Sequence, residues 1–404
     1  MRIVPILVLA FVLSACDDDA PVVTGPTPDP VRSSPTIPTI GTGTVSDRYT
    51  AEVAARGNYA YTSSWGQRSG GSPGNAVYVW NVSGATPQLV RTVVVPSATG
   101  AAVTTTGDVQ VSDDGSLLAV ATERAGGSLA LYSLADPANP LLVSQFHSAD
   151  TDPGVHTAEI SRVGGKLYAF LSVDPGAGIP ARLVVLDLAD PANPVQVLAR
   201  VMGDPYVHDV FVRDSLLFTA LWNTGMTIWD IGGSRGGTPA NPIRISTAQT
   251  VGGKVHNMWW YHDPGGAKRY VFVGEEGPAT AIGGKTAGDI HVVDISNIAA
   301  PVEVAFYTLA EAGTHNFWVD EPSGVLYAAY YNGGVRAIDI RGDLSQCAAA
   351  ARDGTRCNLA RAGREIGNAR SGGFVWGVQG LGNRLFASDM LAGLVVLDIG
   401  TLKR

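Results

Sequence analysis

Short apolar runs alternate with polar turns along most of the chain. Residues 181–201 contain an apolar run, an acidic residue, a turn with two prolines and a second apolar run. Just before them, residues 156–173 hold two more runs separated by a Gly-Gly pair. Runs of this length, bounded by glycine, proline and acidic residues, predict β-strands joined by tight turns. One such unit therefore contains four short strands.

The four-strand unit recurs seven times. Its third strand is the most regular part, because most copies are apolar runs with an Asp near the end. These third strands are expected at residues 76–82, 129–134, 183–188, 226–231, 290–295, 335–340 and 394–399. Four-stranded units spaced by roughly 50–60 residues are typical of β-propellers, in which each blade buries its faces against its neighbours. The sequence thus predicts an all-β fold over residues 36–404, a seven-bladed β-propeller of four-stranded blades.

Two further features refine this architecture. The heptad LADPANP occurs at residues 134–140 and again at 188–194, where we expect the turn between the third and fourth strands of blades two and three. The seventh copy ends without a fourth strand, whereas residues 36–46 look like one. We expect this N-terminal strand to complete the last blade and close the ring, because closure removes two exposed sheet edges. The alternative is that the segment is only a linker.

Two stretches of the chain resemble a known family. They are LVVLDLADPANPVQV at residues 183–197 and THNFWVDEPSGVLYAAYYNGGVRAIDI at residues 314–340. Both are similar to the repeats of the LVIVD-repeat family of bacterial surface and periplasmic proteins. The resemblance implies the propeller fold more than a function, since that family has no general assigned activity. Blades one and two depart from the pattern, with Asn81 and Ser133 where later copies have Asp.

The first residues predict export. Residues 1–15 have one Arg, an apolar stretch and small residues before Cys16, as in a secretory signal. The sequence LSAC resembles a bacterial lipobox, which implies a lipoprotein signal peptide over 1–15 and a lipidated Cys16; an ordinary signal peptide is the alternative. Residues 16–35 then form a Pro-rich tether. On this interpretation Cys16 anchors the protein to a membrane of the bacterial cell envelope, on the periplasmic face or at the cell surface.

The composition argues against nucleic acid as a partner and indicates one disulfide. The formal net charge is −8 and no basic run occurs, so we expect no nucleic-acid partner. Outside the cytoplasm, Cys347 and Cys357 most simply form a disulfide; the alternative, a thiolate metal site, lacks further cysteines. Both lie in residues 341–368, which interrupt blade six as an insertion with a short Ala-rich helical stretch. The insertion is either a contact site or decoration.

Four of the seven histidines share one repeat position. His156, His208, His256 and His315 stand at the start of the first strands of blades three to six. The first strand is innermost in a propeller, so these imidazoles should surround one mouth of the central channel. Converging imidazoles can hold a divalent transition metal such as Zn, Cu, Fe or Ni. The alternative is structural, with each His bonded to its own blade.

Carboxylates fall near the same mouth in this topology. Glu275 and Glu276 end the second strand of blade five, and Asp389 ends that of blade seven. Together with two of the histidines, such acids could hold a hydrolytic metal and its water. The alternative is that they are solvated loop residues.

Aromatic residues complete the candidate binding set. Trp222, Trp376 and Tyr331 should lie at this mouth, where their faces suit a sugar ring or a peptide strand; packing between blades is the alternative. No HExxH or P-loop motif occurs. We therefore expect a binding or display role with an envelope protein or glycan as partner and no cofactor. The alternative is a metal-dependent hydrolase or lactonase-like enzyme that uses the four histidines.

Overall fold

The computed structural model describes residues 34–403 except 69, 177, 204 and 370–372. The predicted signal peptide, the lipidated Cys16 and nearly all of the tether lie outside the described residues. Within them, the regular elements are thirty strands and three single turns of 3-10 helix: η1 (Glu321–Ser323), η2 (Ala349–Ala351) and η3 (Gly400–Leu402). No helix in this part of the chain is long and apolar enough to span a membrane.

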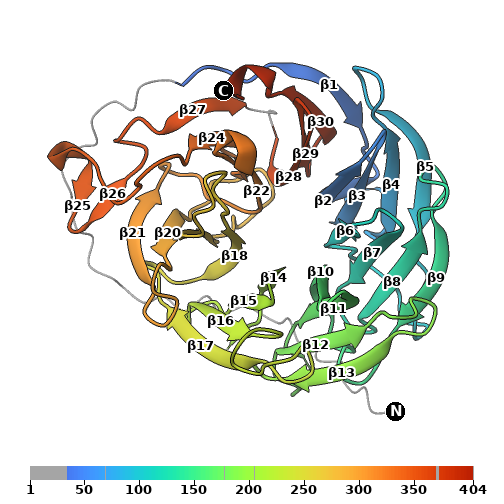
Figure 1. Ribbon diagram of the computed structural model, residues 1–404. Coiled ribbons are helices and arrows are strands. Elements are labelled where there is room, and N and C mark those ends of the chain that lie inside the picture. Colours follow the sequence, from blue (N-terminus) through green and yellow to red (C-terminus); the bar gives the residue numbers. More distant parts are fainter. Residues whose placement is uncertain (1–33, 69, 177, 204, 370–372, 404) are drawn as a thin grey trace, which may run out of the picture. The chain divides into compact units, whose positions relative to one another are not determined.

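Seven antiparallel sheets stand around a ring, as the sequence predicts (Figure 1). The inner strands are β2 (Arg48–Arg56), β6 (Val109–Val111), β10 (Val155–Val163), β14 (Asp209–Arg213), β18 (Val255–Trp260), β22 (Phe317–Asp320) and β28 (Val375–Leu381). The second strands are β3 (Tyr59–Gln67), β7 (Leu117–Thr122), β11 (Lys166–Val173), β15 (Leu216–Ala220), β19 (Tyr270–Glu275), β23 (Val325–Ala329) and β29 (Arg384–Asp389).

The third strands of the blades are β4 (Ala76–Asn81), β8 (Ser128–Ser133), β12 (Arg182–Asp187), β16 (Met226–Asp230), β20 (Ile290–Asp294), β24 (Val335–Asp339) and β30 (Gly393–Asp398). The outer strands are β5 (Gln88–Val94), β9 (Leu141–Phe146), β13 (Val195–Arg200), β17 (Ile243–Ala248), β21 (Val302–Tyr307), β27 (Glu365–Ala369) and β1 (Thr39–Thr44). The third strands lie where the recurring apolar runs predict them. The all-β, seven-bladed architecture is therefore confirmed.

The last residue of each third strand shapes the turn that follows. In blade three, the Asp187 carboxylate accepts a hydrogen bond of 2.8 Å from the Ala189 N–H two residues on. Asn81 and Ser133, which depart from the repeat pattern, accept the same bond with their own side-chain oxygens, at 3.0 and 3.2 Å. Short oxygen-bearing side chains stabilise tight turns in this way. The recurring Asp is therefore a turn residue.

The N-terminal segment runs along two blades. β1 pairs antiparallel with β30, from Thr39 opposite Leu397 to Thr44 opposite Gly393, and is the outer strand of the sheet of blade seven. Just before it, the Ile37 N–H donates to the carbonyl oxygen of Asn368 in β27 at 2.7 Å. The segment thus contacts both blade six and blade seven.

The insertion lies between β24 and β27 of blade six but joins the sheet of blade five. It forms the hairpin of β25 (Arg352–Asp353) and β26 (Arg356–Asn358), and β26 runs parallel to β21. A disulfide joins Cys347 to Cys357, as predicted. Two expectations need correction. The insertion ends before residue 365, because β27 completes blade six, and the Ala-rich stretch is only one 3-10 turn.

The apolar core is divided into layers between neighbouring blades. One layer packs Leu129 of blade two against Val155 of blade three, and another packs Tyr78 of blade one against Phe386 of blade seven. All four side chains are at most 2% exposed. Because a blade buries its faces only against its neighbours, closing the ring fixes the inner strands around a common axis.

Candidate functional site at the channel mouth

A repeated β-bulge directs one residue of an inner strand into the mouth of the channel. In β10, Val155 is opposite Val173 and Thr157 is opposite Ser172, so His156 is the extra residue. The same shift isolates His256 in β18 and Trp376 in β28. A bulge turns its extra residue away from the ladder and re-aims its side chain. In blades three and five, the position of the histidine therefore has a backbone cause.

The bulge residues and their neighbours form a continuous arc of rings. The ring centroids of His156 and His208 are 4.3 Å apart, those of His208 and His256 4.3 Å, and those of His256 and His315 4.2 Å. Trp376 continues the arc 4.1 Å from His315. The structure thus brings together the four histidines expected at this mouth.

His156 differs from the other three because it is surrounded by acids. Its Nδ1 lies 3.5 Å from Glu123 Oε1 and 3.9 Å from Asp174 Oδ2. Burial opposes protonation of this imidazole, but the charges of Glu123, Asp174 and Glu276 outweigh burial and raise the His156 pKa to about 10. His156 is therefore an imidazolium at neutral pH.

The other three histidines stay neutral. Burial lowers the pKa of His256 to about 4, with a further contribution from the positive charge on His156. The pKa values of His208 and His315 also fall well below the usual value, through burial first and neighbouring histidines second. His315 Nδ1 is 2.7 Å from the Trp376 carbonyl oxygen, which can only accept, so this nitrogen carries the proton.

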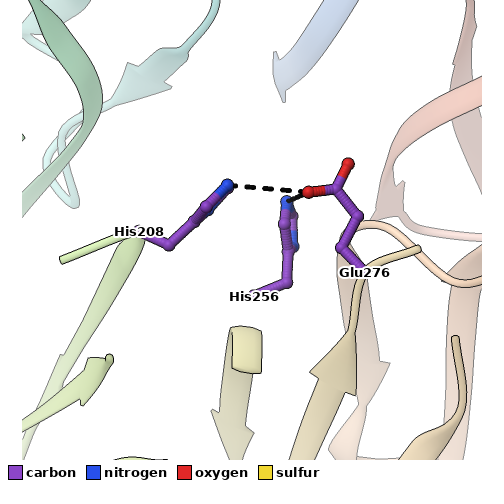
Figure 2. Close-up of side chains that lie close together, drawn as sticks. All are labelled: His208, His256 and Glu276. Carbon is purple, nitrogen blue, oxygen red and sulfur yellow. Dashed lines mark ion pairs between the residues drawn. The ribbon is translucent and has the colours of Figure 1, made fainter. Parts of the chain in front are cut away.

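Glu276 is the acid that reaches the arc. One of its oxygens, Oε2, lies 3.6 Å from His208 Nε2 and 3.8 Å from His256 Nε2, as Figure 2 shows. The other, Oε1, accepts a hydrogen bond from the Tyr331 hydroxyl. The residue is only 8% exposed. A buried carboxylate is thus held between two neutral imidazoles.

The other two predicted acids do not reach this point. Glu275 Oε2 lies 3.3 Å from His291 Nε2, and the opposite ring nitrogen of His291 contacts Glu303 within the same blade. Asp389 accepts hydrogen bonds from the Phe374 and Leu391 N–H groups at 3.0 and 2.9 Å, so it shapes a turn. Of the three predicted acids, only Glu276 therefore joins the histidines at this point.

A cavity of about 330 Å³ occupies the mouth. Its lining combines polar side chains, the imidazoles of His156, His208 and His315 and the carboxylate of Glu276, with a largely aromatic set. The apolar lining consists of Trp65, Pro278, Ala279, Ile282, Tyr331, Phe374, Trp376 and Met390. Sequence reasoning missed the loop between β19 and β20 that supplies three of these residues. Its base is closed by two backbone hydrogen bonds between Gly277 and Ala287, at 2.8 and 2.9 Å.

The two remaining predicted aromatic residues hold strained backbone positions. Trp222 and Tyr331 have φ values of 49° and 41°, a left-handed conformation that bulky residues rarely adopt. Tyr331 is held there by two backbone hydrogen bonds of 3.1 Å to Val375 of the next blade. Trp222 stacks on His208, with ring centroids 5.3 Å apart. Such strain persists where the surroundings fix the residue, often at functional sites.

A second cavity of about 390 Å³ lies in the channel next to the mouth, and carboxyl groups line it. Burial, reinforced by Asp108, raises the pKa of Glu52 to about 8. Burial also raises the pKa of Asp108 and, most strongly, that of Asp209. These residues were not predicted. The available signal was their position, since Asp108 and Asp209 follow directly after the mouth position of their blades.

The mouth and the channel each have one glycine whose missing side chain leaves space for a carboxylate. A Cβ on Gly107, the mouth residue of blade two, would collide with Glu123 Oε1. A Cβ on Gly377, which follows Trp376 in blade seven, would collide with Glu52 Oε1. The two glycines thus leave space for Glu123 beside His156 and for Glu52 in the channel wall.

Comparison with known proteins supports the repeat and the fold. A family model described as LVIVD repeat matches residues 47–67 and 285–308, which lie in blades one and five. No curated protein matches the chain. Among solved structures, the chain is similar to the computationally designed Ika8 protein, with 9% sequence identity and a TM-score of 0.55 over 89% of this chain and 99% of that one. At this identity the likeness concerns the fold alone. The chain is therefore a seven-bladed β-propeller that carries LVIVD repeats.

Proposed function

We propose that this protein is a binding module of the bacterial cell envelope, anchored through Cys16, and that its ligand is the end of an envelope glycan. One sugar residue enters the cavity at the channel mouth. The observation that carries the proposal is the lining of that cavity, which combines aromatic side chains with imidazoles and a carboxylate.

This lining offers a sugar two kinds of contact. Trp65 and Trp376 lie with ring centroids 5.0 Å apart and provide flat apolar faces. Glu276 and the imidazoles provide acceptors and donors for hydroxyl groups. Ligand cavities of about 300–1,000 Å³ with mostly apolar lining and a few polar groups are typical of small-molecule sites. A volume of about 330 Å³ is at the small end of that range, which favours a single ring.

The expected anchor and tether support the same function. A lipidated Cys16 followed by a Pro-rich segment would hold the propeller at a membrane surface, where envelope glycans are within reach. The low charge of the sequence, 16% charged residues, also favours a ligand recognised by shape and hydrogen bonds over one recognised by charge.

The test measures binding of a panel of monosaccharides and disaccharides to the purified full-length protein by calorimetry. Trp376→Ala should weaken binding of the best sugar by at least 10-fold, because it removes one of the two indoles that line the cavity. The control is Trp318→Ala, which removes an indole of the other cavity. If no sugar binds the folded protein, or if both variants weaken binding equally, the proposal fails. Binding of a protein partner at this mouth instead would also contradict it.

A further inference from the structure

We propose that His208, His256 and Glu276 form a binding site for one divalent transition metal ion (Figure 2). The inference deepens the proposed function and rests on the same cavity, since the ion would face the bound ligand. A metal ion would coordinate oxygen atoms of the ligand, which the aromatic side chains of the cavity cannot do.

The spacing of the three groups is the first argument. Glu276 Oε2 is 3.6 Å from His208 Nε2 and 3.8 Å from His256 Nε2, and the three ligand atoms all lie within 4.8 Å of one another. Contacts of that length are too long for hydrogen bonds. Ligands on a tetrahedral ion with bonds of 2.0–2.1 Å lie about 3.3–3.4 Å apart. To bring all three onto one ion, Glu276 would have to move by a few tenths of an ångström, and the two imidazole nitrogens would have to approach each other by at most about 1.4 Å.

The surroundings allow the two imidazoles to move, whereas a hydrogen bond holds the Glu276 carboxylate in place. Within the described structure, the Nδ1 atoms of His208 and His256 are buried and have no hydrogen-bond partner, so neither ring is locked in place at that nitrogen. Glu276 is oriented by Tyr331, whose hydroxyl donates to Oε1 and leaves Oε2 for the ion. A hydrogen-bonded carboxylate of this kind is common around metal sites, because the outer partner fixes the ligand.

A second trio at the mouth fits a metal less well. Glu123, His156 and Asp174 also lie within 4.8 Å of one another. Two imidazoles and one carboxylate suit a transition metal better than one imidazole and two carboxylates, because Ca²⁺ and Mg²⁺ are the ions that prefer oxygen-rich sites. The metal site is therefore assigned to His208, His256 and Glu276.

The ligand types indicate which ions fit. Two imidazoles and one carboxylate suit Zn²⁺, Cu²⁺, Ni²⁺ or Fe²⁺, whereas Ca²⁺ and Mg²⁺ prefer oxygen ligands throughout. Three protein ligands leave a tetrahedral ion one open position, and here that position would face the cavity. It would take an oxygen donor of the ligand, such as a hydroxyl or carboxylate group of a sugar acid.

The test uses the full-length protein after dialysis against a chelator. We expect one Zn²⁺ per chain by calorimetry and elemental analysis, no uptake of Ca²⁺ or Mg²⁺, and tetrahedral absorption bands with Co²⁺. His256→Ala and Glu276→Gln should each weaken Zn²⁺ binding at least about 100-fold, in line with the dependence of metal sites on their ligands. His147→Ala, which changes a histidine outside the arc, should leave it unchanged; thermal unfolding shows that each variant is folded.

Several outcomes would overturn the site. They are no Zn²⁺ binding below millimolar concentration, equal binding by the His256 and Glu276 variants and the parent protein, or loss of binding in His156→Ala alone. The sugar panel separates this inference from the proposed function. Sugar binding by protein that takes no metal would remove the metal site and keep the binding function, whereas Zn²⁺ binding without any sugar would do the reverse.

Discussion

The mouth and the channel beside it are formed by adjacent residues of the same inner strands, yet they carry different chemistry. His208 lines the mouth and Asp209 the channel; His315 and Asn316 divide in the same way. In blade three a bulge separates the two positions, because it removes His156 from the ladder while Thr157 stays paired with Ser172. A local distortion of the inner strand, present in blades three, five and seven, thus contributes to two distinct polar layers.

Burial also has opposite effects on the pKa values of the groups in the two layers. Burial disfavours charge, so it lowers the pKa of imidazoles in the mouth and raises the pKa of carboxyl groups in the channel. In both layers burial therefore favours the neutral form of these groups. The exception is His156, where acids outweigh burial. The mouth is thus the layer with a fixed charge.

The largest expected effect concerns the channel and depends on pH. The folded-state pKa of Glu52 is about 8, above its ordinary value of 4.5. Its carboxyl group therefore favours the folded state at low pH and loses that contribution as pH rises from about 4.5 to 8. One proton contributes at most about 1.4 kcal/mol per pH unit. Relative to Glu52→Gln, which cannot ionise, the parent protein should lose stability steadily across this window.

Chemical denaturation of both proteins at pH 5, 6, 7 and 8 measures that difference. Asp108 and Asp209 face the same space, so the Gln variant also relieves repulsion as they ionise. If the unfolding free energies of the parent protein and Glu52→Gln differ by the same amount at all four pH values, folding does not raise the pKa of Glu52.

The next effect compares the two glycines. Gly377→Ala should displace Glu52 in the channel, and Gly107→Ala should displace Glu123 in the mouth, because each added methyl group collides with the acid. Overpacking of this kind costs about 2 kcal/mol. Gly84→Ala is the matched control, since the nearest atom to its added Cβ is 4.0 Å away. If thermal unfolding shows the same stability for all three variants, the proposed role of the two glycines is contradicted.

The smallest effect is confined to the mouth. Tyr331→Phe removes the hydroxyl that donates to the buried Glu276 and should lower the unfolding free energy by about 1 kcal/mol. The ring itself stays, so packing against Phe374, whose ring centroid is 4.5 Å away, is kept. Unchanged stability in urea denaturation would mean that Glu276 does not depend on this donor.

The repeat pattern predicted the frame of the site but not its chemistry. Strand periodicity placed His156, His208, His256 and His315 in one layer, because the same register recurs in each blade. It could not distinguish Glu275 from Glu276. These neighbours diverge where β19 ends, so that one faces His291 and the other faces the arc. That choice depends on the path of a loop, which periodicity does not determine.

Long-range pairings were hidden for a different reason. The pairing of β26 with β21 joins an insertion of blade six to blade five, and only two residue pairs define it. The channel acids were missed because the residue type at their position varies, from Asp209 to Asn257 to Gly377. A layer can be recognised from the sequence when the same residue type recurs in the blades. A layer of mixed residue types is found only when the blades are placed around the axis.

The pairing of β1 with β30 has a consequence for the order of folding. It joins Thr39 to Leu397, so almost the whole chain lies between the two partners. Contacts of such sequence separation carry the largest loop-closure entropy and form late unless the chain between them is already ordered. We therefore expect residues 39–44, which are synthesised early, to be among the last to acquire native contacts. Until then β30 is an open edge, and the nascent propeller is most exposed to pairing with another chain at that strand.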